Sequence, residues 1–76
     1  MGKMRILDGS GDTVIEWQIE NETSVAEAAE LFLVLQAERR VPFARPAGAP
    51  AAEAEQIRRF DPAAEEIIWV RPITGS

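Results

Sequence analysis

Two aspartates flank a glycine-rich segment near the N-terminus, a pattern that also occurs in cation-binding loops. Asp8 and Asp12 stand on either side of Gly9-Ser10-Gly11, and carboxylate oxygens are the ligands that calcium prefers. A calcium loop needs further spaced oxygen ligands and ends in a bidentate glutamate, which this segment lacks. Asp and Gly are also the residues that tight turns require. The pattern therefore favours a turn, and we expect no metal there.

A second candidate for chemistry is the carboxylate pair Glu65-Glu66 near the C-terminus. Adjacent side chains diverge in direction, and nothing in the sequence places either carboxylate in a desolvated pocket that would raise its pKa. We therefore expect a solvated turn and not an acid–base pair.

Two arginine pairs, Arg39-Arg40 and Arg58-Arg59, are the concentrated cations of the chain. Brought together by the fold, they would form a basic patch able to bind a carboxylate-rich partner. Arg39 and Arg40 are also explained as cations in the last turn of a helix, where they complement its dipole. This second interpretation is favoured, and the patch is the alternative.

Composition excludes most catalytic classes. The 76 residues include neither cysteine nor histidine, so thiolate nucleophiles, histidine bases and ordinary zinc sites are absent. A domain of this size buries only about 60% of its unfolded surface, which leaves no room for a deep cleft. We expect a non-enzymatic protein with no cofactor.

Charge and hydropathy restrict the partners. Eight basic against thirteen acidic residues give a net charge of −5, which repels nucleic-acid phosphates and suits a protein partner. The longest apolar run, from Leu31 to Leu35, is far below the roughly 20 residues of a membrane span. We expect a cytoplasmic protein without a membrane anchor. Met4 could be the initiating residue, which would make residues 1–3 an extension.

The N-terminal half predicts a hairpin followed by a helix. Met4–Leu7 and Thr13–Glu20 are β-type runs around the glycine-rich turn. In the second run, Ile15, Trp17 and Ile19 alternate with Glu16, Gln18 and Glu20, as in a strand buried on one side.

Ser24 and Glu27 fit a capping box that opens a helix over residues 25–40. A stripe at helical spacing should pack on the hairpin; its members are Val25, Ala28, Ala29, Phe32 and Leu35. Leu31, Leu33 and Val34 do not all fit on this stripe. Either the helix is covered on more than one side, or part of this excess faces solvent as a contact surface.

The segment after the helix predicts short elements joined by an exposed loop. Pro42–Arg45 suits a short strand with Pro42 as its first residue or on a sheet edge, and the Pro/Ala/Gly-rich residues 46–55 suit an exposed loop. Residues 53–60 predict two helical turns with Ile57 and Phe60 inward. Asp61-Pro62 predicts the start of a single turn over residues 63–66.

The last strand is predicted at residues 67–73, with the nearly continuous apolar run Ile67–Val70. Such a run is typical of a central strand buried on both faces, and its natural place is beside the first strand. Trp69 is expected in the core; on the open face of the sheet it would instead be an anchor for a partner.

This order of elements indicates an α+β roll in which one main helix packs on one face of a mixed sheet of four to five strands. It resembles the β-grasp, or ubiquitin-like, fold. We expect a single domain over residues 1–73, with residues 74–76 as a flexible tail.

The end of the chain resembles the small subunit of molybdopterin synthase, a sulfur carrier. That family finishes with an acidic pair, an apolar strand, one or two prolines, an aliphatic residue, a small residue and Gly-Gly. The matching residues are Glu65-Glu66, Ile67–Val70, Pro72, Ile73, Thr74 and Gly75. The resemblance implies that the tail, including Arg71, enters a partner, which would be an adenylating enzyme or a larger subunit, and that the terminal carboxylate becomes a thiocarboxylate.

Ser76 departs from the family, which ends in glycine. Three accounts fit: a diverged protein without carrier chemistry, a precursor trimmed after Gly75, or an altered terminus. Trimming would leave one glycine instead of two. Two hypotheses follow: a sulfur-carrier-like protein that uses its tail, and an interaction or assembly module that uses the sheet face or the helix and never activates its carboxylate.

Overall fold

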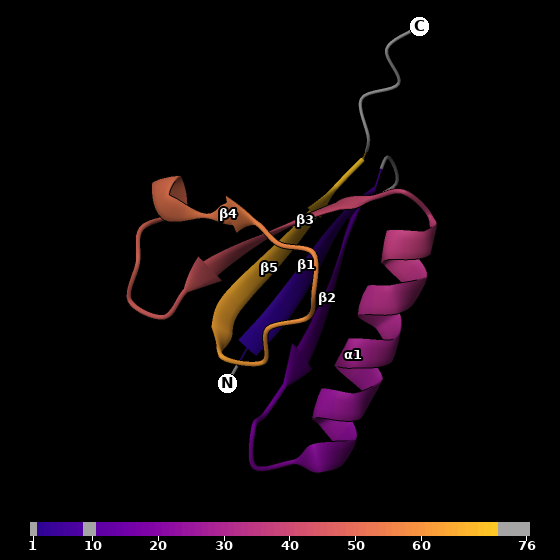
Figure 1. The fold of residues 1–76 in the computed structure, drawn as a ribbon, viewed down its shortest axis with the longest axis vertical. Coiled ribbons are helices and arrows are strands. Elements are labelled where there is room, and N and C mark those ends of the chain that lie inside the picture. The colour runs from indigo at the N-terminus through magenta and orange to yellow at the C-terminus, as the bar shows by residue number, and fades with distance from the viewer. Residues whose placement is uncertain (1, 9–10, 72–76) are drawn as a thin grey trace, which may run out of the picture.

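In the computed structural model, five strands form one mixed sheet, and a long helix lies across one of its faces (Figure 1). The structure describes residues 2–8 and 11–71. The elements are β1 (Gly2–Asp8), β2 (Gly11–Trp17), α1 (Glu22–Ala37), β3 (Val41–Pro46), the 3-10 helix η1 (Ala51–Glu53), β4 (Glu55–Gln56) and β5 (Ala64–Val70). The α+β class with a mixed sheet and one main helix is as the sequence predicts.

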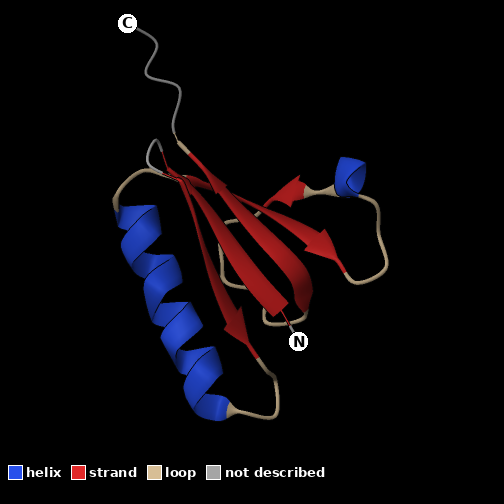
Figure 2. Ribbon diagram, turned by 180° about the vertical axis from the view of Figure 1, so that it is seen from behind, coloured by secondary structure: helices blue, strands red, loops and turns tan. Residues whose placement is uncertain are grey.

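The strand order across the sheet is β2-β1-β5-β3-β4. β1 and β5 are parallel, and the pairs β1–β2, β3–β5 and β3–β4 are antiparallel. The last strand therefore lies in the centre of the sheet beside the first, which confirms the prediction drawn from its apolar run. Seen from behind, the sheet has no helix across its other face in the described residues (Figure 2).

The core fills the space between α1 and the sheet. Its largest fully buried side chains are Trp17, Trp69, Phe32, Met4 and Ile67. The ring centroids of Phe32 and Trp69 lie 4.8 Å apart in an edge-to-face arrangement, which favours the contact beyond simple burial. Both indole N–H groups are satisfied: Trp17 donates to the Pro62 carbonyl at 3.0 Å and Trp69 to the Met4 sulfur at 3.2 Å.

The helix begins earlier than predicted. It starts at Glu22, and the N-cap is Asn21, whose side chain accepts from the Ser24 N–H at 3.2 Å. Ser24 lies inside the first turn, where its hydroxyl donates to the Asn21 carbonyl at 2.8 Å and accepts from the Gln18 N–H at 2.9 Å. Asn and Ser both cap helices, and the prediction of Ser24 as the N-cap is wrong, because Asn21 takes this position. The predicted stripe is confirmed: Ala28, Phe32 and Leu35 are buried, and Val25 and Ala29 are half-buried.

The helix also ends earlier, at Ala37, so Arg39 and Arg40 do not lie in its last turn. Arg39 has φ 64°, and the N–H groups of Arg39 and Arg40 donate to the carbonyls of Gln36 and Leu35 at 3.0 and 3.3 Å. These two bonds define a Schellman motif, which usually places glycine at the left-handed position. The dipole interpretation of this arginine pair is therefore wrong; the pair terminates the helix.

The hairpin is shifted relative to the prediction. β1 includes Gly2 and Lys3, which pair with Trp17 and Glu16, so these two residues of the predicted extension form part of the sheet. β2 ends at Trp17, and Ile19 lies in the following turn with 57% of its surface exposed. Gly9 and Ser10 of the predicted turn lie outside the described residues.

Residues 53–60 do not form the two predicted helical turns. η1 is followed by β4, which pairs with β3, and the Ile57 N–H donates to the Pro42 carbonyl at 3.1 Å. Ile57 and Phe60 still pack against the core, as predicted. Pro42 is the second residue of β3, an inner strand. A residue's N–H and carbonyl point to the same side of a strand, so the missing N–H lies on the side of the two-residue β4, where few ladder bonds are formed.

The predicted turn of helix over residues 63–66 is absent. The N–H groups of Ala63 and Ala64 donate to the side chain and the carbonyl of Asp61 at 2.9 and 3.1 Å. This tight turn lets β5 begin at Ala64, and the two glutamates that follow lie in the strand.

No helix in the described residues is long and apolar enough to cross a membrane.

Candidate functional site

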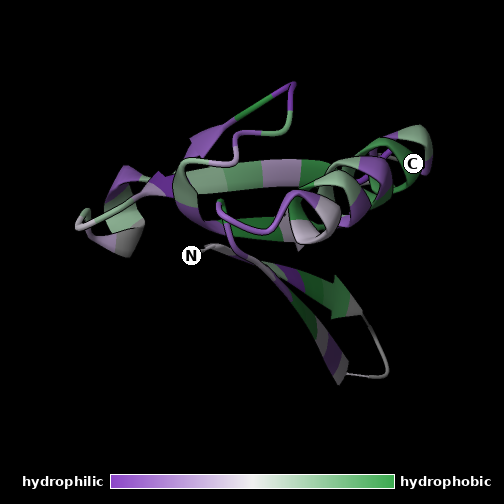
Figure 3. Ribbon diagram, turned by 90° about the horizontal axis from the view of Figure 1, so that it is seen from below, coloured by the Kyte–Doolittle hydropathy of each residue, from purple (hydrophilic) through white to green (hydrophobic). Residues whose placement is uncertain are grey.

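The face of the sheet opposite α1 carries a second, separate set of side chains. Met4 and Ile6 of β1 point into the core, so Lys3, Arg5 and Leu7 point to the other face. Apolar and charged residues alternate along the β1–β2 hairpin, which Figure 3 shows as green and purple bands. We call this surface the open face. The strand register assigns it Asp12, Val14, Glu16, Lys3, Arg5, Leu7, Glu66, Ile68, Val70, Val41, Phe43 and Arg45.

One end of the open face is a row of charges that alternate in sign across four strands. Glu16 pairs with Lys3, Lys3 with Glu66, and Glu66 with Arg45 in the register. Glu66 is only 8% exposed, and three cations surround it: Lys3 Nζ at 3.8 Å, Arg5 Nη2 at 3.8 Å and Arg45 Nε at 3.5 Å. A buried carboxylate requires such compensation. This charged row therefore joins β1, β5 and β3.

Glu65 extends this charged row toward the loop after β3. Its carboxylate accepts from Arg45 Nη1 at 2.9 Å and from the Gly48 N–H at 3.2 Å, and Arg45 also donates to the Ala49 carbonyl at 2.9 Å. The Gly48 hydrogen bond and then the Arg45 guanidinium lower the pKa of Glu65 below its usual 4.5. The prediction of a solvated turn at residues 65 and 66 is wrong: both glutamates lie in β5, where Glu65 accepts hydrogen bonds and Glu66 forms ion pairs.

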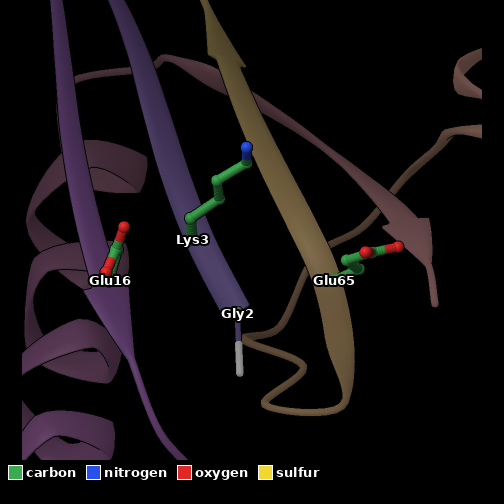
Figure 4. A pocket seen from close by; sticks show the side chains of 4 residues that line it. All are labelled: Gly2, Lys3, Glu16 and Glu65. Carbon is green, nitrogen blue, oxygen red and sulfur yellow. The ribbon is translucent and has the colours of Figure 1, made fainter.

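A shallow cavity of about 230 Å³ lies beside this row and is lined by Gly2, Lys3, Glu16 and Glu65. In the close view, Lys3 reaches toward β5 and away from Glu16 (Figure 4). The lining of the cavity offers two carboxylates and one ammonium as binding groups, and the ammonium of Lys3 is already paired with Glu66. The described residues contain no cluster of three or more acidic side chains placed to hold a metal ion.

The other end of the open face is apolar. Ile68 lies between Arg5 and Phe43, and Arg5 pairs on its far side with Val14. Phe43, Ile68 and Val70 are half-buried and Val14 is 49% exposed, so β5 is not buried on both faces as its apolar run predicts. We call Leu7, Val14, Val41, Phe43, Ile68 and Val70 the apolar end. The signal that could have found it is the alternation of Val41, Phe43 and Arg45 with buried Pro42 and Ala44.

Of the residues predicted for the tail and its partner, the structure describes two. Trp69 is fully buried beneath α1, so it is a core residue and is not a surface anchor; Pro42 and Ile6 beside it point to the same side. Arg71 follows β5 and is exposed. Pro72, Ile73, Thr74, Gly75 and Ser76 lie outside the described residues.

The two arginine pairs belong to segments that meet at one hydrogen bond. The Gln36 side chain donates to the Arg58 carbonyl at 2.9 Å, which links the end of α1 to residues 57–60. Arg39, Arg58 and Arg59 are exposed. Arg40 instead turns toward Glu38, with Nε 3.1 Å from Oε1. The structure thus brings the segments together but commits Arg40 to a local carboxylate.

The excess apolar residues of α1 divide between the two alternatives. Leu31 is half-buried against the core, whereas Leu33 and Val34 are 65% and 49% exposed. Leu33 and Val34 are two neighbouring residues of one helix, whereas the apolar end gathers six apolar residues from four strands, which makes it the stronger candidate site.

Comparisons of this chain with protein-family models, with curated proteins and with solved structures find no match.

Proposed function

We propose that the fold is a β-grasp roll and that the protein is a small non-enzymatic, ubiquitin-like protein that acts by being bound. The strand order β2-β1-β5-β3-β4 with α1 across one face supports the fold. One observation carries the function: the apolar end of the open face adjoins the end of β5, from which the chain continues to its C-terminal residues. A partner that covers this end also meets the end of β5 at Val70 and Arg71, which follows it.

The chemistry of the open face favours a protein partner. Phe43 and Ile68 supply neighbouring apolar contacts on two central strands, and Arg5 supplies a cation with 41% of its side chain exposed. Aromatic and arginine side chains are enriched at protein interfaces. The net charge of −5 opposes nucleic acid as the partner. We place this activity in the cytoplasm.

The first form of the proposal is a sulfur-carrier-like protein. The partner is then an adenylating enzyme, which joins the terminal carboxylate to the α-phosphate of ATP and releases pyrophosphate, or a larger subunit that receives the tail. Residues 72–75 match the sulfur-carrier ending and support this form. The sheet face positions the protein, and the tail carries the reactive carboxylate.

The second form is an interaction or assembly module whose carboxylate is never activated. Ser76 favours it, because a terminal side chain clashes in a channel that is shaped for an extended glycine. The open face then acts alone, and the tail adds contacts without chemistry.

Incubation with ATP and an adenylating enzyme from the same host, followed by mass spectrometry, separates the two forms. The carrier form predicts a gain of one AMP, and with a sulfur donor the replacement of oxygen by sulfur, in the native chain or in Ser76→Gly. If neither chain gains mass with any adenylating enzyme of that host, the carrier form is wrong.

Binding through the open face is tested with the Phe43→Asp variant. It should lower affinity for the adenylating enzyme, or for a larger subunit encoded beside the gene, by at least tenfold, since apolar anchors dominate interfaces. Leu33→Asp, which places the same charge on the exposed side of α1, is the control. Equal binding by both variants, with circular dichroism showing both folded, would contradict binding through the open face.

A further inference from the structure

The two edges of the sheet differ in length and protection. β4 closes one edge with only two residues, whereas β2 forms the opposite edge with seven. An edge strand presents unpaired N–H and carbonyl groups, and proteins usually limit this exposure with short strands, proline or charged side chains, lysine above all. β2 has seven residues, contains neither proline nor lysine, and carries the two acidic side chains Asp12 and Glu16. Its outer edge is therefore available for pairing with an extended segment of opposite charge.

The exposed side chains of β2 indicate what that segment must carry. Asp12, Val14 and Glu16 alternate along the strand on the open face, and all three are exposed. Among the described residues, no cation lies within 4.0 Å of either carboxylate. Lys3 pairs with Glu16 in the register, but its side chain reaches toward β5 (Figure 4), where its ammonium lies 3.8 Å from the Glu66 carboxylate. The edge thus offers an acidic, apolar, acidic pattern.

A second copy of the chain fits this edge poorly. Symmetric antiparallel pairing about Val14 places Asp12 of each chain opposite Glu16 of the other, and like charges directly opposite each other destabilise a strand pair. The net charge of −5 on each chain adds repulsion. The carboxylates oppose self-pairing while favouring an oppositely charged strand.

We infer that the outer edge of β2 accepts an extended segment of a partner protein with a basic, apolar, basic pattern at alternate positions. Backbone hydrogen bonds to β2 provide affinity, as in other cases of strand addition. The central apolar side chain contacts Val14, and the flanking cations face Asp12 and Glu16. This site shares only Val14 with the apolar end of the open face, and its test reports backbone pairing along β2, so it can fail while the function proposed above stands.

The test is titration of the ¹⁵N-labelled protein with synthetic nonapeptides at low salt. The first carries Lys-Thr-Val-Thr-Lys at its centre and the second carries Glu-Thr-Val-Thr-Glu. A third repeats the first with N-methyl groups on two consecutive residues, so that one N–H facing β2 is lost in either alignment. We expect the first peptide to shift amide signals of residues 11–17, and the other two to bind roughly tenfold more weakly or not at all.

A charge exchange makes the test specific. In the double variant Asp12→Lys and Glu16→Lys, preference should invert in favour of the acidic peptide. Glu27→Lys with Glu30→Lys makes the same change in net charge on the exposed side of α1 and should leave the preference for the basic peptide intact. Equal binding of all three peptides, shifts centred away from β2, or no inversion in the double variant would each overturn the inference, as would concentration-dependent dimerisation through β2.

Discussion

Gly2 lies directly against the indole of Trp17, which pairs with it across the β1–β2 hairpin. A Cβ at residue 2 would overlap the six-membered ring of the indole and would lie 2.8 Å from the Ala64 carbonyl oxygen. Trp17 is fully buried, and its N–H is held by Pro62. The ring therefore has little freedom to move away, and residue 2 must be glycine for a reason of packing and not of backbone conformation.

Gly2→Ala should therefore lower the free energy of unfolding by about 1–3 kcal/mol, the usual cost of overpacking. Urea unfolding followed by tryptophan fluorescence measures it. Lys3→Ala is the control at the neighbouring position: it removes a partly exposed ion pair with Glu66, which is worth about 1 kcal/mol or less. A Gly2→Ala protein as stable as the native chain would show that β1 does not begin in the manner described.

Arg39 stands at a left-handed position that glycine normally occupies, with φ 64°. Arg39→Gly should raise stability by about 1 kcal/mol. A side chain in this conformation costs about 1–2 kcal/mol, and glycine removes that strain but loses more backbone entropy on folding, which offsets part of the gain. Thermal unfolding measures the change. Arg39→Ala removes the charge and keeps Cβ, so it should not stabilise. If both substitutions stabilise equally, charge and not backbone strain is the cause.

The predictable part of this fold comes from burial periodicity. The alternation of Ile15 and Trp17 and the stripe on α1 each report which side of an element meets the core, and the structure places both as expected. The apolar run of β5 correctly indicated a central strand, but the predicted burial on both faces and the continuation of the alternation to Ile19 were wrong. Element boundaries were harder to predict. Asn21 and Ser24 are both good N-cap residues. In the structure, Asn21 accepts from the Ser24 N–H, while the Ser24 hydroxyl accepts from the Gln18 N–H in the preceding turn.

The segment before β5 was mispredicted because long-range contacts determine its conformation. Local composition favours helix, but Phe60 lies edge-on to Trp17 with ring centroids 5.0 Å apart, and 6.0 Å from Phe32. To reach both rings the chain remains extended and irregular across the core. The buried position of Glu66 was missed for the same kind of reason, since its three cations come from β1 and β3 and are distant in sequence.

The contribution of Glu65 to the free energy of unfolding should fall as the pH is lowered. The Gly48 N–H and the Arg45 guanidinium lower its pKa in the folded protein below the usual 4.5, so folding favours the carboxylate. This contribution is complete above the unfolded-state pKa and is lost as the pH falls through the lower folded-state pKa. Glu65→Gln should therefore unfold more easily than the native chain near neutral pH, and the difference should shrink in acid. Urea unfolding at a series of pH values measures it, and a constant difference would contradict the lowered pKa.

Removing the charge of Glu66 should lower the free energy of unfolding more than removing an exposed charge does, because its carboxylate is almost fully buried among Lys3, Arg5 and Arg45. Glu66→Gln keeps the shape of the side chain but leaves three neighbouring cations without their shared anion. Two of those cations are 41% exposed and keep part of their hydration, so the loss should be about 1–3 kcal/mol and not the larger cost of a fully buried pair. Glu55→Gln, an exposed change on β4, should alter stability by less than about 0.5 kcal/mol. Urea unfolding of both variants at neutral pH decides the matter: equal stabilities would mean that the charged row does not hold β1, β5 and β3 together.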